Sequence, residues 1–401
     1  MARSFYKIPL PEPPAIAFSS IAGRHVFHRS LTDGYMERFF PLCEHFRTQD
    51  EPSFCGVSTL AMVLNAMGQD PGRVWKGPWR YYHEDMLTCC VPLQIVKRDG
   101  ITFRQLECLA RCNGASVKSY MAMDPQVTVD VFREYVKRST SFGSEFMIAS
   151  YSRKHLDQTG DGHFSPVGGY DADNDLVLIM DVARFKYPPH WIPLKLLFEA
   201  MTLFDETTGR SRGFMVLSKR MGHSIYFLIS QRIKSWRDFI DKIRTTLVPL
   251  CDNVQKSCLQ VDVEESAESM LMCVTKRFSG DVLSMISTYA NEFSLNHVSV
   301  AHQEQVDLLL EQLRSTAAFG VISRYHNPPT TDDDLPAHEV MTILLLALPR
   351  STWEGDDGFL SPCIKCFFPD SLPEPLNNEV IAIRYQIEAL LQYCNYGQCS
   401  L

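Results

Sequence analysis

The sequence predicts an α+β protein of two domains, with a mixed domain over residues 1–220 and an acidic, mainly helical domain over residues 221–401. A helical pattern starts near residue 55, and two short apolar runs separated by a polar turn lie between residues 163 and 181. Helical stripes dominate the second part of the chain. With 401 residues, of which 45% are hydrophobic, the chain is long enough to bury two separate cores.

Charge and hydropathy argue against two classes of protein. The net charge is −8 and its excess lies in the second domain, so no strongly basic face is available for nucleic acid. The longest strongly apolar stretch, Val340 to Pro349, has ten residues and is too short to cross a bilayer. The chain begins with MARSFYKIPLPEPPAIAF, which lacks the continuous apolar core of a secretory signal. We therefore expect a soluble, cytoplasmic protein without nucleic-acid or membrane partners.

The helical pattern near residue 55 places a cysteine where a nucleophile would be activated. We expect a loop from Gln49 that enters a helix ending near Gly68, because apolar residues recur at helical spacing. Cys55 then lies in the first turn, where unpaired backbone N–H groups favour the thiolate. Gln49 can join the Cys55 backbone N–H in donating to an oxyanion. The spacing rests on Val57, Leu60, Ala61, Leu64 and Met67.

A β-hairpin supplies the partners that such a nucleophile needs. The runs HFSPVGGY and LVLIM flank the polar turn at residues 171–175. Antiparallel pairing around this turn brings His163 and Asp181 opposite each other or one step out of register. The carboxylate would fix the imidazole tautomer, and the imidazole would take the proton of Cys55, as in a Cys-His-Asp triad. Each residue taken alone is more simply explained by burial or surface packing; only their combination favours a triad.

Three helical stripes and one loop are expected in the second domain. Polar and proline-rich residues at 326–339 predict an exposed loop. The first stripe covers residues 236–247, with Ser235 as its N-cap, and the others cover residues 301–318 and 378–394.

Two blocks of the sequence carry a family resemblance. The first runs from QDEPSFCGVSTL at residue 49 to Cys90, and the second runs from QTGDGHFSPVGGY at residue 158 to Met201. Both resemble phytochelatin synthases, and DVARFKYPPHW, which begins at Asp181, is the most specific part. The similarity extends over residues 5–220, and VMTILLLALPRSTW at 340–353 is more weakly similar to the C-terminal part of eukaryotic members.

The resemblance implies a papain-like cysteine protease fold in the N-terminal half and an acyltransferase activity (EC 2.3.2.15). Cys55, His163 and Asp181 would form the triad, with Gln49 at the oxyanion hole. The enzyme would transfer γ-glutamylcysteine from glutathione to glutathione or a growing phytochelatin through a Cys55 thioester, releasing glycine. Its products would chelate metals in heavy-metal detoxification.

The same resemblance suggests which side chains contact glutathione. Asp205 and Arg212, in FDETTGRSRGF, would grip the α-ammonium and α-carboxylate of the γ-glutamyl group. The competing interpretation is a solvated ion pair in a turn. The acceptor contacts would be Arg153, Arg184, Lys186 and Tyr187, although Arg184 and Lys186 can equally well project into solvent.

Thirteen cysteines, an odd number, predict free thiols in a reducing compartment rather than a disulfide scaffold. No organic cofactor is expected. The family resemblance implies activation by cadmium, zinc or copper, presented as metal–glutathione thiolates, because thiolates select soft ions. Six cysteines are candidate metal ligands within the protein, and ordinary packing is the competing interpretation. The candidates are Cys89, Cys90, Cys108, Cys112, Cys363 and Cys366.

The expected partners are glutathione, phytochelatin peptides and heavy-metal ions, with a homodimer as one candidate assembly. Two alternative functions stay open. The same triad could pass the acyl group to water, giving a peptidase that removes glycine from glutathione or its conjugates. A protein with this many thiols could also bind metals without catalysis.

Overall fold

The computed structural model describes residues 8–71, 74–219, 300–325, 337–348 and 372–395. The chain divides into two compact units, Met1–Met221 and Gly222–Leu401. Within the described residues, no helix has the length and apolar character needed to cross a membrane.

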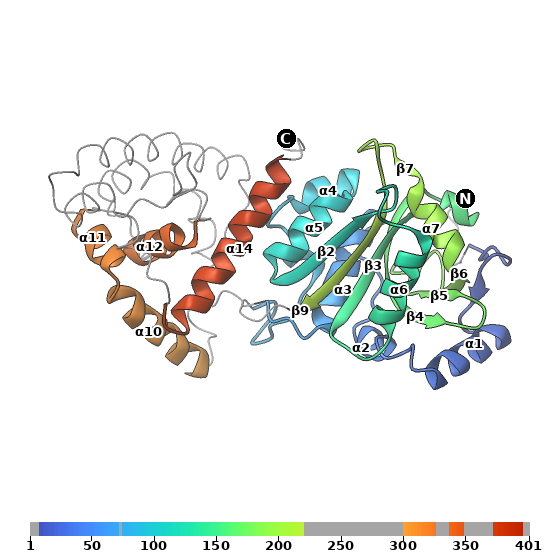
Figure 1. Cartoon of the computed structure of the whole chain (residues 1–401), viewed down its shortest axis with the longest axis horizontal. Coiled ribbons are helices and arrows are strands. Elements are labelled where there is room, and N and C mark those ends of the chain that lie inside the picture. The colour runs from blue at the N-terminus through green and yellow to red at the C-terminus, as the bar shows by residue number, and fades with distance from the viewer. Residues whose placement is uncertain (1–7, 72–73, 220–299, 326–336, 349–371, 396–401) are drawn as a thin grey trace. The chain divides into compact units, whose positions relative to one another are not determined.

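The first unit is built on a mixed sheet-and-helix core, which confirms the α+β expectation. Seven strands form one antiparallel sheet in the order β1-β6-β5-β4-β3-β9-β2 (Figure 1). Two further short strands, β7 and β8, form a separate antiparallel pair. The bounds are β1 Ile16–Ala17, β2 Ala115–Met121, β3 Glu145–Ser152, β4 Gly162–Asp171, β5 Leu176–Ile179, β6 His190–Pro193, β7 Phe204–Asp205, β8 Arg210–Ser211 and β9 Gly213–Lys219.

Helices cover both faces of this sheet. Two of them, α6 (Val129–Thr140) and α7 (Leu194–Thr202), share a buried core with Met147 and Ala149 of β3. The helix α3 (Cys55–Ala66) packs on β4, where its Gly56 lies against Phe164. Phe164 pairs across the ladder with Ser150, which alternates with Ala149, so α3 lies on the other face. The remaining helices are α1 Ile21–Thr32, α2 Phe39–Glu44, α4 Leu93–Asp99 and α5 Phe103–Cys112, with 3-10 turns η1 Glu84–Met86 and η2 Lys154–Leu156.

The helix that the sequence predicts with Cys55 in its first turn is confirmed as α3, which begins at Cys55 itself. Gly68 follows its C-terminal end with a φ of +62°, a backbone conformation that glycine adopts without strain. Every residue from Gly56 to Leu64 is buried, so α3 is a central helix rather than a surface one. Its position is therefore fixed by packing on several sides.

The predicted hairpin is also confirmed, but its register differs from the simple expectation. Strands β4 and β5 pair antiparallel, and a bulge lies between Val167 and Gly169. A Cβ on Gly168 would come within 2.6 Å of Met180 Sδ, so the close packing at the bulge favours glycine. Asp181 lies two residues beyond Ile179, the last residue of β5, and pairs with no residue of β4, so the backbone register does not set it opposite His163.

Four helices of the second unit are described: α10 (Val300–Arg314), α11 (Ala317–Tyr325), α12 (Ala337–Ala347) and α14 (Leu376–Asn395). The predicted stripe at 378–394 lies within α14. The stripe at 301–318 is divided, because the Thr316 hydroxyl accepts a hydrogen bond from the Phe319 backbone N–H and starts a new helix. The stripe at 236–247, Cys363 and Cys366 lie outside the described residues.

Candidate active site

The candidate nucleophile lies where α3 meets β4. Thr59 of α3 donates a hydrogen bond of 3.1 Å to the carbonyl of Phe164, which directly follows His163. Burial raises the pKa of the Cys55 thiol, while hydrogen bonding with the Phe164 backbone and the positive charge of Arg153 act in the opposite direction. The same residue that holds the helix to the sheet therefore also contacts the thiol.

His163 and Asp181 form a buried pair despite their backbone register. The His163 Nε2 lies 2.9 Å from Asp181 Oδ1, and the same oxygen accepts a hydrogen bond of 2.8 Å from the Ala183 backbone N–H. The Asp181 carboxylate can only accept, so Nε2–H donates to it and the lone pair of the neutral ring is on Nδ1; the Arg153 Nη2, 2.9 Å from the same Nε2, then contacts it without a hydrogen bond. The Tyr151 ring packs edge-on against the imidazole with centroids 5.8 Å apart. These contacts fix the ring as a base directed away from its carboxylate.

The charges around this pair favour a neutral histidine. Burial, together with the charge of Arg153, lowers the pKa of His163 to about 4, although Asp181 acts in the opposite direction. Burial disfavours the charged form of Asp181, but His163 and Arg153 together hold the pKa of its carboxyl well below the usual range. The site at rest therefore contains a thiol, a neutral imidazole and a carboxylate.

Gln49 is attached to the same site by its backbone. Its N–H donates to the carbonyl of Val182, the residue after Asp181, with a length of 3.0 Å. Its side-chain Nε2 donates to the carbonyls of Glu51 at 2.8 Å and Pro52 at 2.9 Å. Its buried Oε1 has no hydrogen-bond partner among the described residues. An oxyanion in the site would have to take over one of the two Nε2 hydrogen bonds.

The predicted glutathione contacts Asp205 and Arg212 have different partners. Arg212 is buried, and its Nη1 donates to the carbonyls of Leu203 and Phe204 at 3.1 and 2.9 Å. Its Nη2 lies 3.2 Å from Asp161 Oδ1. Asp205 is half-buried and accepts hydrogen bonds from the turn that follows it, from Thr207 and Thr208. The structure thus pairs Arg212 with Asp161, which the sequence analysis did not identify.

The predicted acceptor contacts divide into buried and accessible side chains. Arg153 is 3% exposed and lies over the ring of the buried Tyr187, 5.1 Å from its centroid. Arg184 is exposed and lies 4.8 Å from the centroid of the Phe46 ring. Lys186 is half-buried, and burial, together with the charge of Arg153, lowers its pKa. Two accessible cations, Arg184 and Lys186, therefore lie close to the triad in sequence, whereas Arg153 is enclosed.

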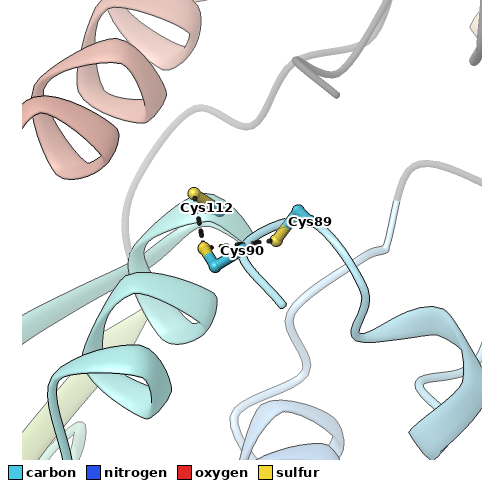
Figure 2. Close-up of side chains that lie close together, drawn as sticks. All are labelled: Cys89, Cys90 and Cys112. Carbon is cyan, nitrogen blue, oxygen red and sulfur yellow. Dashed lines mark hydrogen bonds between the residues drawn. The ribbon is translucent and has the colours of Figure 1, made fainter. Parts of the chain in front are cut away.

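Buried thiols gather where the segment after η1 meets the end of α5. The sulfurs of Cys89, Cys90 and Cys112 all lie within 4.8 Å of one another (Figure 2). The Cys90 sulfur is 3.8 Å from Cys89 and 3.6 Å from Cys112, and Cys108 is 4.0 Å from Cys112. Burial and the neighbouring thiols raise the pKa of Cys90 well above its ordinary value. The four predicted cysteines of the first unit thus form one cluster.

Two more polar residues near the triad were not identified from the sequence. Gln158 and His190 are buried and hydrogen-bonded to each other. Gln158 lies in an irregular loop without periodicity, and His190 begins β6, where a single histidine resembles any core residue. One sequence feature could have pointed to Gln158. The segment 153–161, which leads to His163, is rich in polar residues.

Comparisons with known proteins identify the family of this chain. The model of the phytochelatin synthase family matches residues 5–214. Glutathione gamma-glutamylcysteinyltransferase 1 of Arabidopsis thaliana is 35% identical, over 98% of this chain and 96% of the relative. The glutathione gamma-glutamylcysteinyltransferase of Schizosaccharomyces pombe is 40% identical, over 100% of this chain and 89% of the relative. The chain is a member of the phytochelatin synthase family.

Proposed function

We propose that this protein transfers γ-glutamylcysteine from glutathione to a second glutathione or to a growing phytochelatin, releasing glycine. Family membership supports the reaction, and the relatives named glutathione gamma-glutamylcysteinyltransferase support the donor. The observation that carries the chemistry is the buried His163–Asp181 pair beside the strand residue that contacts Cys55. This arrangement, a thiol at the start of a helix packed on an antiparallel sheet, is also the basis for proposing a papain-like fold.

The first half of the reaction forms a thioester. His163 Nδ1 takes the thiol proton as the Cys55 sulfur attacks the carbonyl carbon of the cysteine–glycine amide. The amide bond then breaks, and His163 returns the proton to the departing nitrogen of glycine. An imidazolium with a pKa of about 4 is a stronger acid than an ordinary one, which assists departure of the amine. The acyl group remains on Cys55 as γ-glutamylcysteinyl thioester.

The second half transfers the acyl group to an amine. The α-amine of the acceptor attacks the thioester, His163 takes a proton from it, and the Cys55 thiol is regenerated. The negative oxygen formed in both halves would be stabilised by the Cys55 backbone N–H at the start of α3 and by the Gln49 amide.

We propose that Arg212 and Asp205 hold the γ-glutamyl end of the donor. Arg212 is positioned by three contacts, and Asp205 bonds only to its own turn, so each could exchange a contact for substrate. Asp161, bonded to Arg212, is a second acidic group near the ammonium. Arg184, Lys186 and Tyr187 would line the side on which the acceptor binds, with the two cations available to its carboxylates.

Heavy-metal activation is the further part of this proposal. Cadmium, zinc or copper would bring the acceptor as a metal–glutathione thiolate. The cluster of Cys89, Cys90, Cys108 and Cys112 is also a candidate ligand set, since sulfurs around tetrahedral zinc are separated by roughly 3.8 Å when each bond is about 2.3 Å. Titrating Cys55→Ser with cadmium should give thiolate-to-metal absorption that Cys90→Ser in the same background weakens. Unchanged absorption would remove the cluster from the proposal.

Product analysis tests the reaction itself. With glutathione and cadmium, mass spectrometry should detect oligomers of γ-glutamylcysteine and an acyl group on Cys55, and Cys55→Ser should give neither. If γ-glutamylcysteine accumulated without longer products, the protein would be a deglycinating peptidase. If Cys55→Ser still turned over glutathione, the proposed Cys55–His163–Asp181 triad would be wrong.

A cytoplasmic location is proposed because glutathione is the substrate and the described cysteines are thiols. A homodimer stays a prediction, for which analytical ultracentrifugation is the measurement.

A further inference from the structure

A continuous chain of buried polar side chains extends from the triad into the core. The Arg153 Nη2 donates to Asp181 Oδ2 at 2.6 Å, and its Nη1 donates to Gln158 Oε1 at 2.6 Å. The Gln158 Nε2 lies 3.0 Å from His190 Nε2, and the His190 Nδ1 lies 2.8 Å from the carbonyl of Pro188. Arg153 and Gln158 are 3% and 4% exposed, and Asp181 and His190 are not exposed at all.

The direction of each hydrogen bond follows from its partners. Arg153 can only donate, so Gln158 must present its oxygen to the guanidinium and its amide hydrogens to His190. The Pro188 carbonyl can only accept, so His190 carries its proton on Nδ1 and accepts on Nε2. Burial lowers the pKa of His190 and keeps it neutral. Every member of the chain therefore has one orientation, which ends at the carboxylate of the triad.

Backbone hydrogen bonds also hold the loop between β3 and β4 around Arg153. The Arg153 carbonyl accepts from the N–H groups of Leu156 and Gln158, and its own N–H donates to the carbonyl of Asp161. The loop between β3 and β4 is thus folded onto Arg153, and the last of these contacts is at Asp161, two residues before His163. The side chain of Gln158 is held in reach of both Arg153 and β6.

We propose that Arg153, held by Gln158 and His190, is a positioning residue that orients Asp181 and opposes protonation of His163. This inference rests on the proposed function of the triad. Asp181 alone would favour the imidazolium and trap the proton taken from Cys55. The Arg153 Nη2 lies 2.9 Å from His163 Nε2 as well as next to Asp181, so its charge opposes that effect. The proton is then released readily to the departing glycine.

The rival role for Arg153 is the acceptor contact that the sequence suggested. A substrate carboxylate would have to reach an enclosed guanidinium that already lies on Tyr187 and binds Asp181 and Gln158. It would also have to leave Asp181 without its cation. The two roles differ in what they change: a positioning residue alters the pH dependence of acylation, and an acceptor contact alters the KM of the acceptor.

The first experiment measures single-turnover acylation of the full chain by glutathione, followed as glycine release from pH 4 to 8. For Arg153→Met we expect the acid limb to move up by at least about one pH unit, because a cation next to the imidazole is lost. For Gln158→Leu, which leaves every triad residue in place, we expect a smaller shift in the same direction. The KM for the acceptor should change less than about threefold. An unmoved acid limb with an acceptor KM raised tenfold or more would overturn the inference.

A control variant removes another arginine that is paired with a fully buried aspartate, although this arginine is itself half-buried. Arg29 makes two hydrogen bonds of 2.6 Å to the buried Asp171 at the other end of β4. Arg29→Met should lower stability without moving the acid limb. If Arg29→Met moved the acid limb as far as Arg153→Met does, the shift would reflect a general loss of stability, and the inference would fail.

A measurement without turnover separates this inference from the proposed reaction. In Cys55→Ser labelled with ¹⁵N in its histidine rings, NMR titration should show His163 with a strongly depressed pKa and His190 protonated on Nδ1. Adding Gln158→Leu should raise the pKa of His163. If Arg153→Met does not fold, Gln158→Leu replaces it as the test variant. A His163 that titrates near 6.5 in the parent, or is unaffected by Gln158→Leu, would contradict the inference whatever reaction the enzyme performs.

Discussion

At the scale of single residues, the site depends on how the Asp181 charge is neutralised. Its two oxygens are bonded to His163, Arg153 and the Ala183 backbone, with no exposure to solvent. A buried ion pair contributes little net stability, but removing one partner leaves the other charge uncompensated. We therefore expect the same contacts to affect both folding and the proposed catalysis.

We expect Asp181→Asn to lower the free energy of unfolding by about 3 kcal/mol, because the charge of Arg153 would stay buried without a counter-charge. The double variant Asp181→Asn/Arg153→Met should recover much of that loss, since it removes both charges. Urea unfolding of the two single variants and the double variant gives the coupling energy. Additive losses would show that the two side chains do not interact in the folded protein.

Asp205 offers the opposite case, a side chain whose loss should affect binding and not folding. It is half-buried, and its carboxylate contacts only Thr207 and Thr208 of its own turn in the described residues. Asp205→Ala should raise the KM for donor glutathione at least about tenfold, equivalent to about 1.4 kcal/mol, with little change in melting temperature. Glu206→Ala, at the exposed neighbour, is the control and should leave KM unchanged. Equal losses of stability and activity would argue against a substrate contact.

At the scale of elements, the sequence predicted what periodicity encodes. The apolar spacing that follows Cys55 predicted α3 with Cys55 in its first turn, and the two apolar runs predicted β4 and β5. The bulge at Gly168 was not predicted. The apolar runs on either side of it are short, and their pattern fits a regular pairing as well as one shifted by a residue. The division between α10 and α11 was missed because Ser315 and Thr316 continue a helical stripe in which only the cap shows the break.

In the candidate site too, the residues in regular elements were predicted and those in irregular loops were not. Cys55, His163 and Asp181 were predicted because their elements and spacing are local signals. The contacts of Arg153 with Gln158 and of Gln158 with His190 depend on an irregular loop that reaches another strand. No periodic pattern encodes such a loop, so those partners required the fold.

Close approach of two strands gives an element-scale prediction. A Cβ on Gly213, the first residue of β9, would lie 1.9 Å from the backbone oxygen of Tyr120 on β2. Gly213→Ala should therefore destabilise the protein by about 2 kcal/mol or more and raise the donor KM, because it displaces the neighbouring Arg212. Gly320→Ala on α11 is the control. There the nearest atom is an Arg324 guanidinium nitrogen at 4.0 Å, and a gain of up to about 1 kcal/mol is expected. Equal effects of both changes on the urea midpoint would contradict this account.

At the scale of the whole molecule, a buried neutral histidine makes stability depend on pH. The pKa of His163 falls from 6.5 to about 4 on folding, so between these values the unfolded chain binds a proton that the folded chain does not. Stability therefore falls as the pH is lowered through this window.

Between pH 7.5 and pH 4 this histidine should cost roughly 3 kcal/mol of unfolding free energy. Urea unfolding across that range measures the slope, and His163→Phe should flatten it without removing the contributions of other groups. A slope identical in the parent and in His163→Phe would place the titration elsewhere.

The neutral resting state of the triad also bears on chemical damage. Peroxide and alkylating agents react with thiolates far faster than with thiols, so Cys55, whose thiol pKa is raised by burial, is a poor target for them. If Cys55 is the nucleophile, as proposed, then the burial that raises the pKa of its thiol also protects this sulfur from irreversible oxidation.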